Sequence, residues 1–179
     1  MRCAFVTLSA AILTFAVSVP TFGQSPGAVE QSATYTSEFD RALTLRKVGI
    51  LPVTDNLEGI YARAMESRLQ ELVRGNHKWD LVELRLAGSV PTPSDLEANP
   101  EQVMSLTQGS GAEAVFAMRA SRGPNGLTIT MNLFLVSDGK LLLQEVVRDY
   151  PQYENKEVLA QVSSMYQKLV AKMPYSGLV

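Results

Sequence analysis

One compact apolar run, Lys47–Val53, constrains the fold of this chain more than any other stretch. It begins with a basic residue, shows no polar alternation and is followed by the polar triplet Thr54-Asp55-Asn56. An uninterrupted run of this kind is typical of a β-strand that is covered on both faces. The run therefore predicts the central strand of an α/β sheet, with Ile50 fully buried in it.

The N-terminus has the parts of a secretory signal peptide. Arg2 supplies a positive charge, residues 4–19 are apolar and uncharged, and Pro20 precedes small residues at 21 and 23. We expect cleavage near Gln24, which predicts a periplasmic or secreted protein with no stable membrane insertion after cleavage. The alternative, an uncleaved anchor, needs an apolar span of about 20 residues. Cys3, the only cysteine, precedes the apolar stretch and is not a lipobox cysteine.

Composition predicts the domain organisation. Residues 1–23 form the signal peptide, 24–46 a lead-in poor in large apolar residues with a short helix over Ser37–Leu43, 47–174 a single α/β domain, and 175–179 a tail. The 16 basic and 18 acidic residues form no long run of one sign. This balance predicts no nucleic-acid partner.

Hydrophobic period predicts the elements after the central strand. They are a helix over 57–74, an edge strand over Trp79–Leu84, a helix over Glu101–Gln108, strands over Ala114–Ala120, Leu127–Val136 and Lys140–Asp149, and a helix over 155–173. The three later strands are joined by Asn-Gly and Asp-Gly turns and so predict a meander.

The helix ends carry their own signals. Asp55 or Asn56 is expected to cap the first helix, and Gly75-Asn76 to end it. Pro100 opens the second helix. Asn155 is expected to cap the last helix and Pro174 to close it.

The element order is therefore β-α-β-α-β-β-β-α. Right-handed crossovers in opposite directions place the second strand on one side of the first and the third strand on the other. The predicted fold is α/β, a three-layer α/β/α arrangement. Its mixed five-stranded sheet has the order 2-1-3-4-5, and only strand 4 is antiparallel.

Two stretches carry a resemblance to known proteins. The run Lys47–Asn56 with the helix after it, and Gly109–Phe116 entering a meander, are similar to the N-terminal domain of the periplasmic protein TolB and to related domains of the CsgG, LpoB and FlgT type. The resemblance covers about Lys47 to Met173. It implies an anticodon-binding-domain-like sheet of the same order, and an accessory role in envelope assembly through protein contacts without catalysis.

Catalytic motifs in the sequence have simpler explanations. Gly23–Gly27 fits the serine-hydrolase pattern G-x-S-x-G around Ser25, but it spans the expected cleavage site instead of a strand-to-helix turn. His77, the only histidine, is expected on the surface without a nucleophile beside it. Gly109–Gly111 lacks the lysine of a phosphate-binding loop and is read as a helix stop with a tight turn.

Two further sets of side chains are assigned to structure. Asp95, Glu97 and Glu101 have no histidine or cysteine near them and are expected to be solvated, so we predict no metal and no cofactor. Core packing is expected for the methionines on apolar helix faces, Met65, Met104, Met165 and Met173.

One location invites a functional reading. In an open α/β sheet, ligands bind beyond the C-terminal ends of the strands where the strand order reverses. Here that crevice is formed by Thr54, Asp55, Asn56, Ser121 and Arg122. The preferred interpretation remains a non-catalytic exported protein that binds one or more envelope proteins. The alternative is a small-ligand-binding protein or a hydrolase that uses this crevice.

Overall fold

The structure, a computed structural model, describes residues 45–86, 88–151 and 154–173. The predicted signal peptide and its cleavage site, the helix over Ser37–Leu43, the Gly23–Gly27 motif, the Pro174 stop and the 175–179 tail lie outside these residues. These assignments therefore stay predictions.

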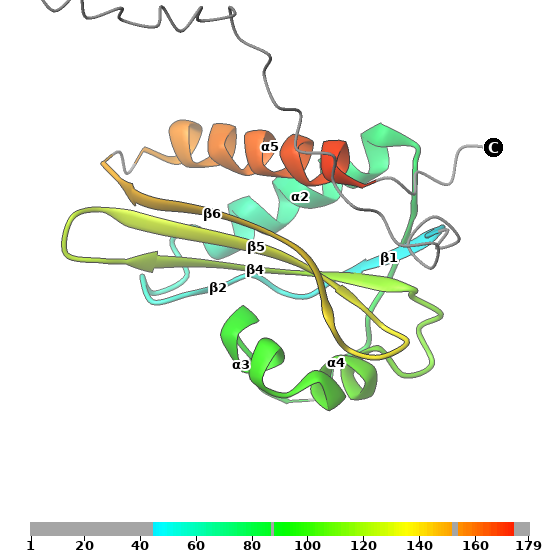
Figure 1. Cartoon of the computed structure of the whole chain (residues 1–179). Coiled ribbons are helices and arrows are strands. Elements are labelled where there is room, and N and C mark those ends of the chain that lie inside the picture. The colour runs from blue at the N-terminus through cyan, green and yellow to red at the C-terminus, as the bar shows by residue number, and fades with distance from the viewer. Residues whose placement is uncertain (1–44, 87, 152–153, 174–179) are drawn as a thin grey trace, which may run out of the picture. The chain divides into compact units, whose positions relative to one another are not determined.

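The sheet has the predicted strand order (Figure 1). Its elements are β1 (Lys47–Ile50), β2 (Thr54–Asp55), α2 (Ala62–Asn76), β3 (Asp80–Val82), α3 (Pro93–Ala98), α4 (Pro100–Thr107), β4 (Ala114–Arg122), β5 (Leu127–Leu135), β6 (Leu141–Tyr150) and α5 (Asn155–Lys172). The order is β3-β1-β4-β5-β6, and the two-residue β2 also pairs with β4. β1 is parallel to β3 and β4, whereas β5 is antiparallel to β4 and β6. The predicted order and meander are confirmed, with β2 as an addition.

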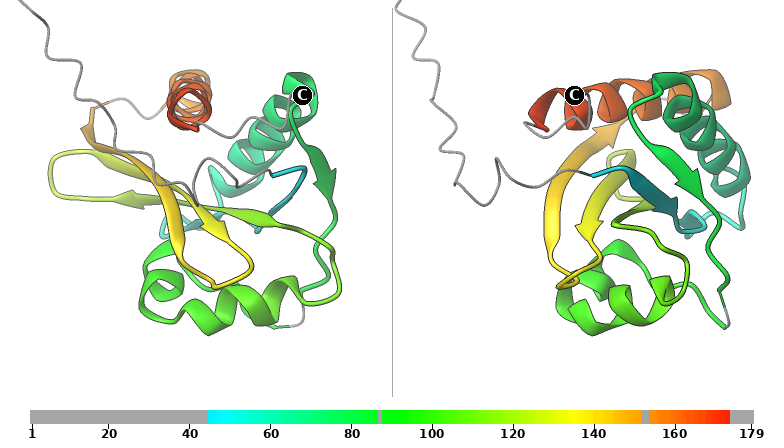
Figure 2. Two further views of the ribbon diagram at one scale, coloured as in Figure 1. Left: turned by 45° about the vertical axis from the view of Figure 1, so that its right-hand side comes forward. Right: turned by 90° about the vertical axis from the view of Figure 1, so that its right-hand side faces the viewer.

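Helices cover both faces of the sheet, as expected. α2 and α5 lie on one face, and α3 and α4 lie on the other (Figures 1 and 2). Alternate residues of β4 point to opposite faces. Phe116 and Met118 therefore join the larger core under α2 and α5, while Val115 and Ala117 join a smaller core with Leu96 of α3.

The central strand is correctly placed, but the predicted burial of Ile50 is wrong. Val48 and Leu51 are 0% and 1% exposed, whereas Ile50 is only partly buried. The reason lies in the edge strand, because β3 pairs with β1 only as far as Gly49. Beyond that point Ile50 lines an open groove beside the sheet.

The first helix begins later than its apolar period predicts. The chain forms a turn over residues 57–61 in which Glu58 and Gly59 have φ angles of 57° and 80°. Left-handed backbone of this kind cannot continue into an α-helix. α2 therefore starts at Ala62, and it includes Gly75 and Asn76 instead of ending before them.

Two other helix ends differ from prediction. α3 is not among the predicted elements, but Thr92 and Asp95 form a reciprocal capping box around Pro93 at the first helical turn. Asn155 does not cap α5, because it is already the first helical residue and Glu154 occupies the cap position without a side-chain bond. Pro100 opens α4 as predicted.

Candidate functional site

The predicted crevice residues lie together at the end of the central strands. Thr54 and Asp55 form β2, which pairs in parallel with Arg119 and Ala120 of β4. Asn56 accepts a hydrogen bond at Oδ1 from the backbone N–H of Arg122, 2.8 Å away. Ser121 is half-buried and Arg122 exposed.

The Asp55 carboxylate is occupied by the loop that it holds. Oδ1 accepts the N–H groups of Leu57 and Gly59 at 3.0 and 2.7 Å, and Oδ2 accepts those of Tyr61 and Ala62 at 3.2 and 3.1 Å. Burial raises the pKa of Asp55, but the four backbone bonds outweigh it and hold the pKa below its ordinary value of 3.8. The predicted capping role is thus met by Asp55, which reaches the start of α2 across the turn.

His77 lies on the surface, as expected, where it ends α2. It is exposed, and its φ of 52° places it in the left-handed region at the helix C-cap.

Replacing His77 with glycine should raise the free energy of unfolding by about 0.5–1 kcal/mol, because glycine adopts this conformation without steric strain. Urea unfolding of His77→Gly checks this, and a lower urea midpoint would contradict it.

The other predicted side chains also serve the fold. Gly109 and Gly111 have φ angles of 75° and 73° in the turn after α4, which confirms the predicted stop and turn. Glu97 Oε1 accepts hydrogen bonds from Asn132 Nδ2 at 2.6 Å and Gln144 Nε2 at 2.9 Å, so it ties α3 to β5 and β6. Within the described ranges no group of three or more His, Cys, Asp or Glu residues could hold a metal ion.

The methionine prediction holds for three positions of four. Met65 and Met165 are fully buried and Met173 is 7% exposed. Met104 is 37% exposed, so its assignment to the core was wrong. It lies on α4, which packs against the smaller core with Val103 and Leu106 instead.

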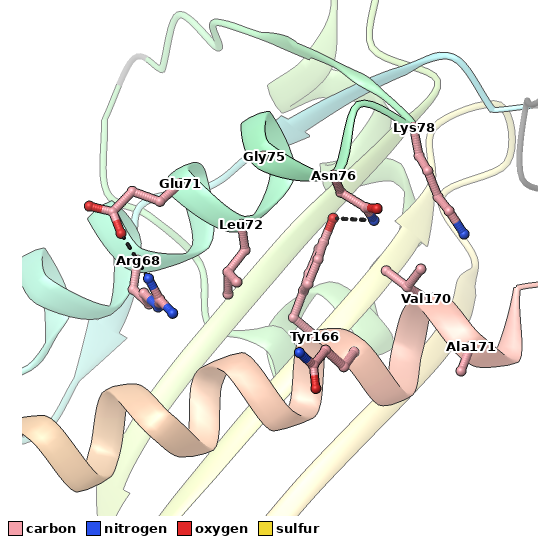
Figure 3. A pocket seen from close by; sticks show the side chains of 10 residues that line it. Arg68, Glu71, Leu72, Gly75, Asn76, Lys78, Tyr166, Val170 and Ala171 are labelled. Carbon is pink, nitrogen blue, oxygen red and sulfur yellow. Dashed lines mark hydrogen bonds and ion pairs between the residues drawn. The ribbon is translucent and has the colours of Figure 1, made fainter.

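An open groove between α2 and α5, which the sequence did not indicate, lies on the helical face of the molecule (Figure 3). Its volume is about 590 Å³. The lining residues from α2 and the turn after it are Arg68, Glu71, Leu72, Gly75, Asn76 and Lys78, and those from α5 are Tyr166, Gln167, Val170 and Ala171. The floor is apolar and aromatic, and the rim is polar.

One cation on the rim of this groove has no charge partner among the described residues. Arg68 is neutralised by Glu71, with Nη1 3.1 Å from Oε2, and its Nε donates to Ser163 Oγ of α5 at 3.0 Å. Lys78, by contrast, has no ion pair or hydrogen bond with another described residue. The groove therefore carries a net positive charge at one end, where Figure 3 shows Lys78 near Val170.

Tyr166 connects the groove to the core. Asn76 Nδ2 donates to its hydroxyl at 3.1 Å, and its ring packs against Trp79 and Phe116 with centroid distances of 6.3 and 6.1 Å. Burial raises the pKa of the Tyr166 phenol, and the bond from Asn76 opposes this shift only in part. The phenol is therefore neutral and cannot act as a base near pH 7.

The arrangement suits recognition more than chemistry. Apolar side chains at the floor and hydrogen-bonding groups at the rim are the usual composition of a contact surface. Nothing that lines the groove forms a nucleophile–base pair, which covalent catalysis would require. No helix in the described part of the chain has the length and apolar character to cross a membrane.

The comparisons with known proteins concern the fold. No family model matches the sequence, and no curated protein matches it. Among solved structures, the chain is similar to the LpoB C-terminal domain from Escherichia coli, with 17% identity, coverage of 59% of this chain and 83% of that chain, and a TM-score of 0.43. It is also similar to the PelC dodecamer from Paraburkholderia phytofirmans, with 14% identity, coverage of 75% and 91%, and a TM-score of 0.46.

TolB from Acinetobacter baumannii is a further match, with 18% identity and a TM-score of 0.43. The match covers 72% of this chain but only 29% of that protein. LpoB and TolB, to which the sequence was expected to be similar, are thus both among the matching structures.

The groove was missed because its residues are far apart in the sequence. Arg68 and Ser163 are separated by 95 positions, and Asn76 and Tyr166 by 90. One signal was present, since Tyr166 is an aromatic residue with a polar tip within an aliphatic helix stripe. A buried tyrosine hydroxyl needs a partner, but the sequence does not say which element supplies it.

Proposed function

We propose that this protein is a non-catalytic exported module that binds another protein of the cell envelope, and that the groove between α2 and α5 receives that partner. The observation that carries the proposal is the groove itself, with an apolar floor and, on its rim, Lys78, which has no partner in the described part of the chain. The resemblance to the TolB, CsgG, LpoB and FlgT type and the predicted signal peptide support the envelope as the compartment.

The groove favours a partner with an apolar side chain next to an acidic one. Leu72 and Val170, which are only partly buried, offer apolar surface for the first. Lys78 offers a charge for the second, and a pair formed there would be partly shielded from water. The partner class is therefore a protein segment of mixed apolar and acidic character.

Gly75 provides a clean way to block the groove. A Cβ atom added to it meets no atom within 4 Å, and its backbone is ordinary right-handed helix. Gly75→Trp should therefore fill the groove and leave the fold intact, because a non-glycine residue in a helix is favoured by up to about 1 kcal/mol. Arg63→Trp is the matched control, since Arg63 is exposed on the same helix and does not line the groove.

The test is capture from envelope extracts with the purified protein and both variants. We expect wild type and Arg63→Trp to retain the same partner and Gly75→Trp to lose at least about tenfold of the captured amount, which corresponds to about 1.4 kcal/mol. Equal capture by all three would remove the groove from the proposal. Turnover of an ester, peptide or phosphate substrate that disappears in His77→Ala would replace it with the hydrolase alternative.

A further inference from the structure

The outer edge of β6 is a second surface of interest. β6 is the last strand of the sheet and has ten residues, whereas β3 at the opposite edge has three. Within the described residues β6 pairs only with β5. In an edge strand, alternate backbone N–H and C=O groups point away from the sheet and offer hydrogen bonds to another chain.

Only the middle of this edge is regular. The pairing of β5 with β6 shifts between Leu133 and Phe134 and again between Leu127 and Ile129. Bulges of this kind twist an edge away from a second strand. Between them, Leu143–Val147 keeps a continuous register, and five residues is the length of a common β-strand.

Two exposed apolar side chains lie at the start of the edge. Leu141 is 38% exposed and Met104 of α4 is 37% exposed. The turn between β5 and β6 lies against α4 (Figure 1), and a Cβ atom added to Gly139 would lie 2.0 Å from the Pro100 carbonyl oxygen. Because Met104 is one helical turn after Pro100, Leu141 and Met104 are held at the same end of β6.

A basic flank of α5 lies over the same edge. Lys172 Nζ forms an ion pair with Glu145 Oε1, which places this flank above β6. Lys168 is one turn earlier on that flank and is exposed, and it forms no ion pair with a described residue. Side chains of an added strand that point toward α5 would therefore meet an uncompensated cation.

We propose that Leu143–Val147 accepts an extended segment of a partner protein by strand addition. An apolar side chain of that segment contacts Leu141 and Met104, and an acidic side chain faces Lys168. The proposal rests on the proposed function for the kind of ligand but uses a different surface from the α2–α5 groove.

The probe is a synthetic nine-residue peptide in which a leucine is followed by alternating glutamate and valine, so that the leucine and the glutamates point to opposite faces of the extended peptide. Two matched peptides replace every glutamate with lysine, or carry N-methyl groups on alternate amides and so lose the outward hydrogen bonds. Binding to the 15N-labelled protein is followed by the amide NMR signals of Leu143–Val147. The protein variants are Lys168→Glu and, as a groove control, Gly75→Trp.

We expect the glutamate peptide to shift these amide signals, the lysine peptide to bind at least about tenfold more weakly, and the N-methylated peptide not to bind. Lys168→Glu should reverse the preference between the glutamate and lysine peptides, because it replaces the cation with an anion and leaves the strand edge unchanged. Gly75→Trp should bind the glutamate peptide like wild type, which separates this surface from the groove. Equal affinity for the glutamate and N-methylated peptides, or no peptide-induced shift in β6, would overturn the proposal.

Discussion

Replacing Phe116 with alanine is expected to lower the free energy of unfolding by about 3–5 kcal/mol. The side chain is fully buried near the start of β4, and its ring lies 6.0 Å from Trp79 and 6.1 Å from Tyr166 by centroid distance. Its removal would lose the transfer free energy of the ring, leave a cavity and break two aromatic contacts, each of which contributes about 0.5–1.5 kcal/mol.

Urea unfolding followed by circular dichroism measures this loss. Phe116→Leu is the matched control, because it keeps most of the volume and should cost about 1 kcal/mol. In the alanine variant, Tyr166 should also lose its packing support, so the Asn76 side-chain amide signals should shift while those of Asn132 stay unchanged. A loss below about 1 kcal/mol for alanine would show that the three-ring cluster does not join α5 to the sheet.

The sheet was predictable because its signals are local. The apolar run at Lys47–Val53 identified the central strand, and the turns at Gly126 and Gly139 fixed the meander. The handedness of crossover connections then left one strand order. The late start of α2 was missed because it depends on hydrogen bonds of a side chain and not on the spacing of apolar residues. Asp55 makes these bonds to the turn before α2.

α3 could have been found, since Thr92 and Asp95 have the spacing of a capping box and Pro93 stands at the first helical position. The partial burial of Ile50 could not have been predicted from the sequence, because it depends on where β3 stops along β1. The same holds for the groove, which exists only because α2 and α5 pack side by side on one face of the sheet (Figure 2). Sequence period indicates which face of each helix is apolar, but not how much of that face a neighbour leaves uncovered.

Asp55 is expected to stabilise the fold by more than an ordinary helix cap. A single cap contributes about 1 kcal/mol, but Asp55 satisfies four backbone N–H groups, two of them at the start of α2. Asp55→Ala should therefore lower the free energy of unfolding by about 2–3 kcal/mol, because the partly buried donors lose a charged acceptor. Thermal unfolding at pH 7 measures this, with Asp80→Ala as the control because Asp80 is exposed at the sheet edge.

The contribution of Asp55 should also depend on pH, with a definite sign. Its pKa in the folded protein lies below the ordinary value of 3.8, so the folded state binds this proton less readily than the unfolded state does. The stabilisation is therefore fully present above about pH 4 and is lost as the pH falls through the folded pKa. Wild type and Asp80→Asn should lose stability more steeply than Asp55→Asn as the pH falls from 5 to about 2.5. If Asp55→Asn follows the same acid profile as wild type, the carboxylate does not hold the turn between β2 and α2.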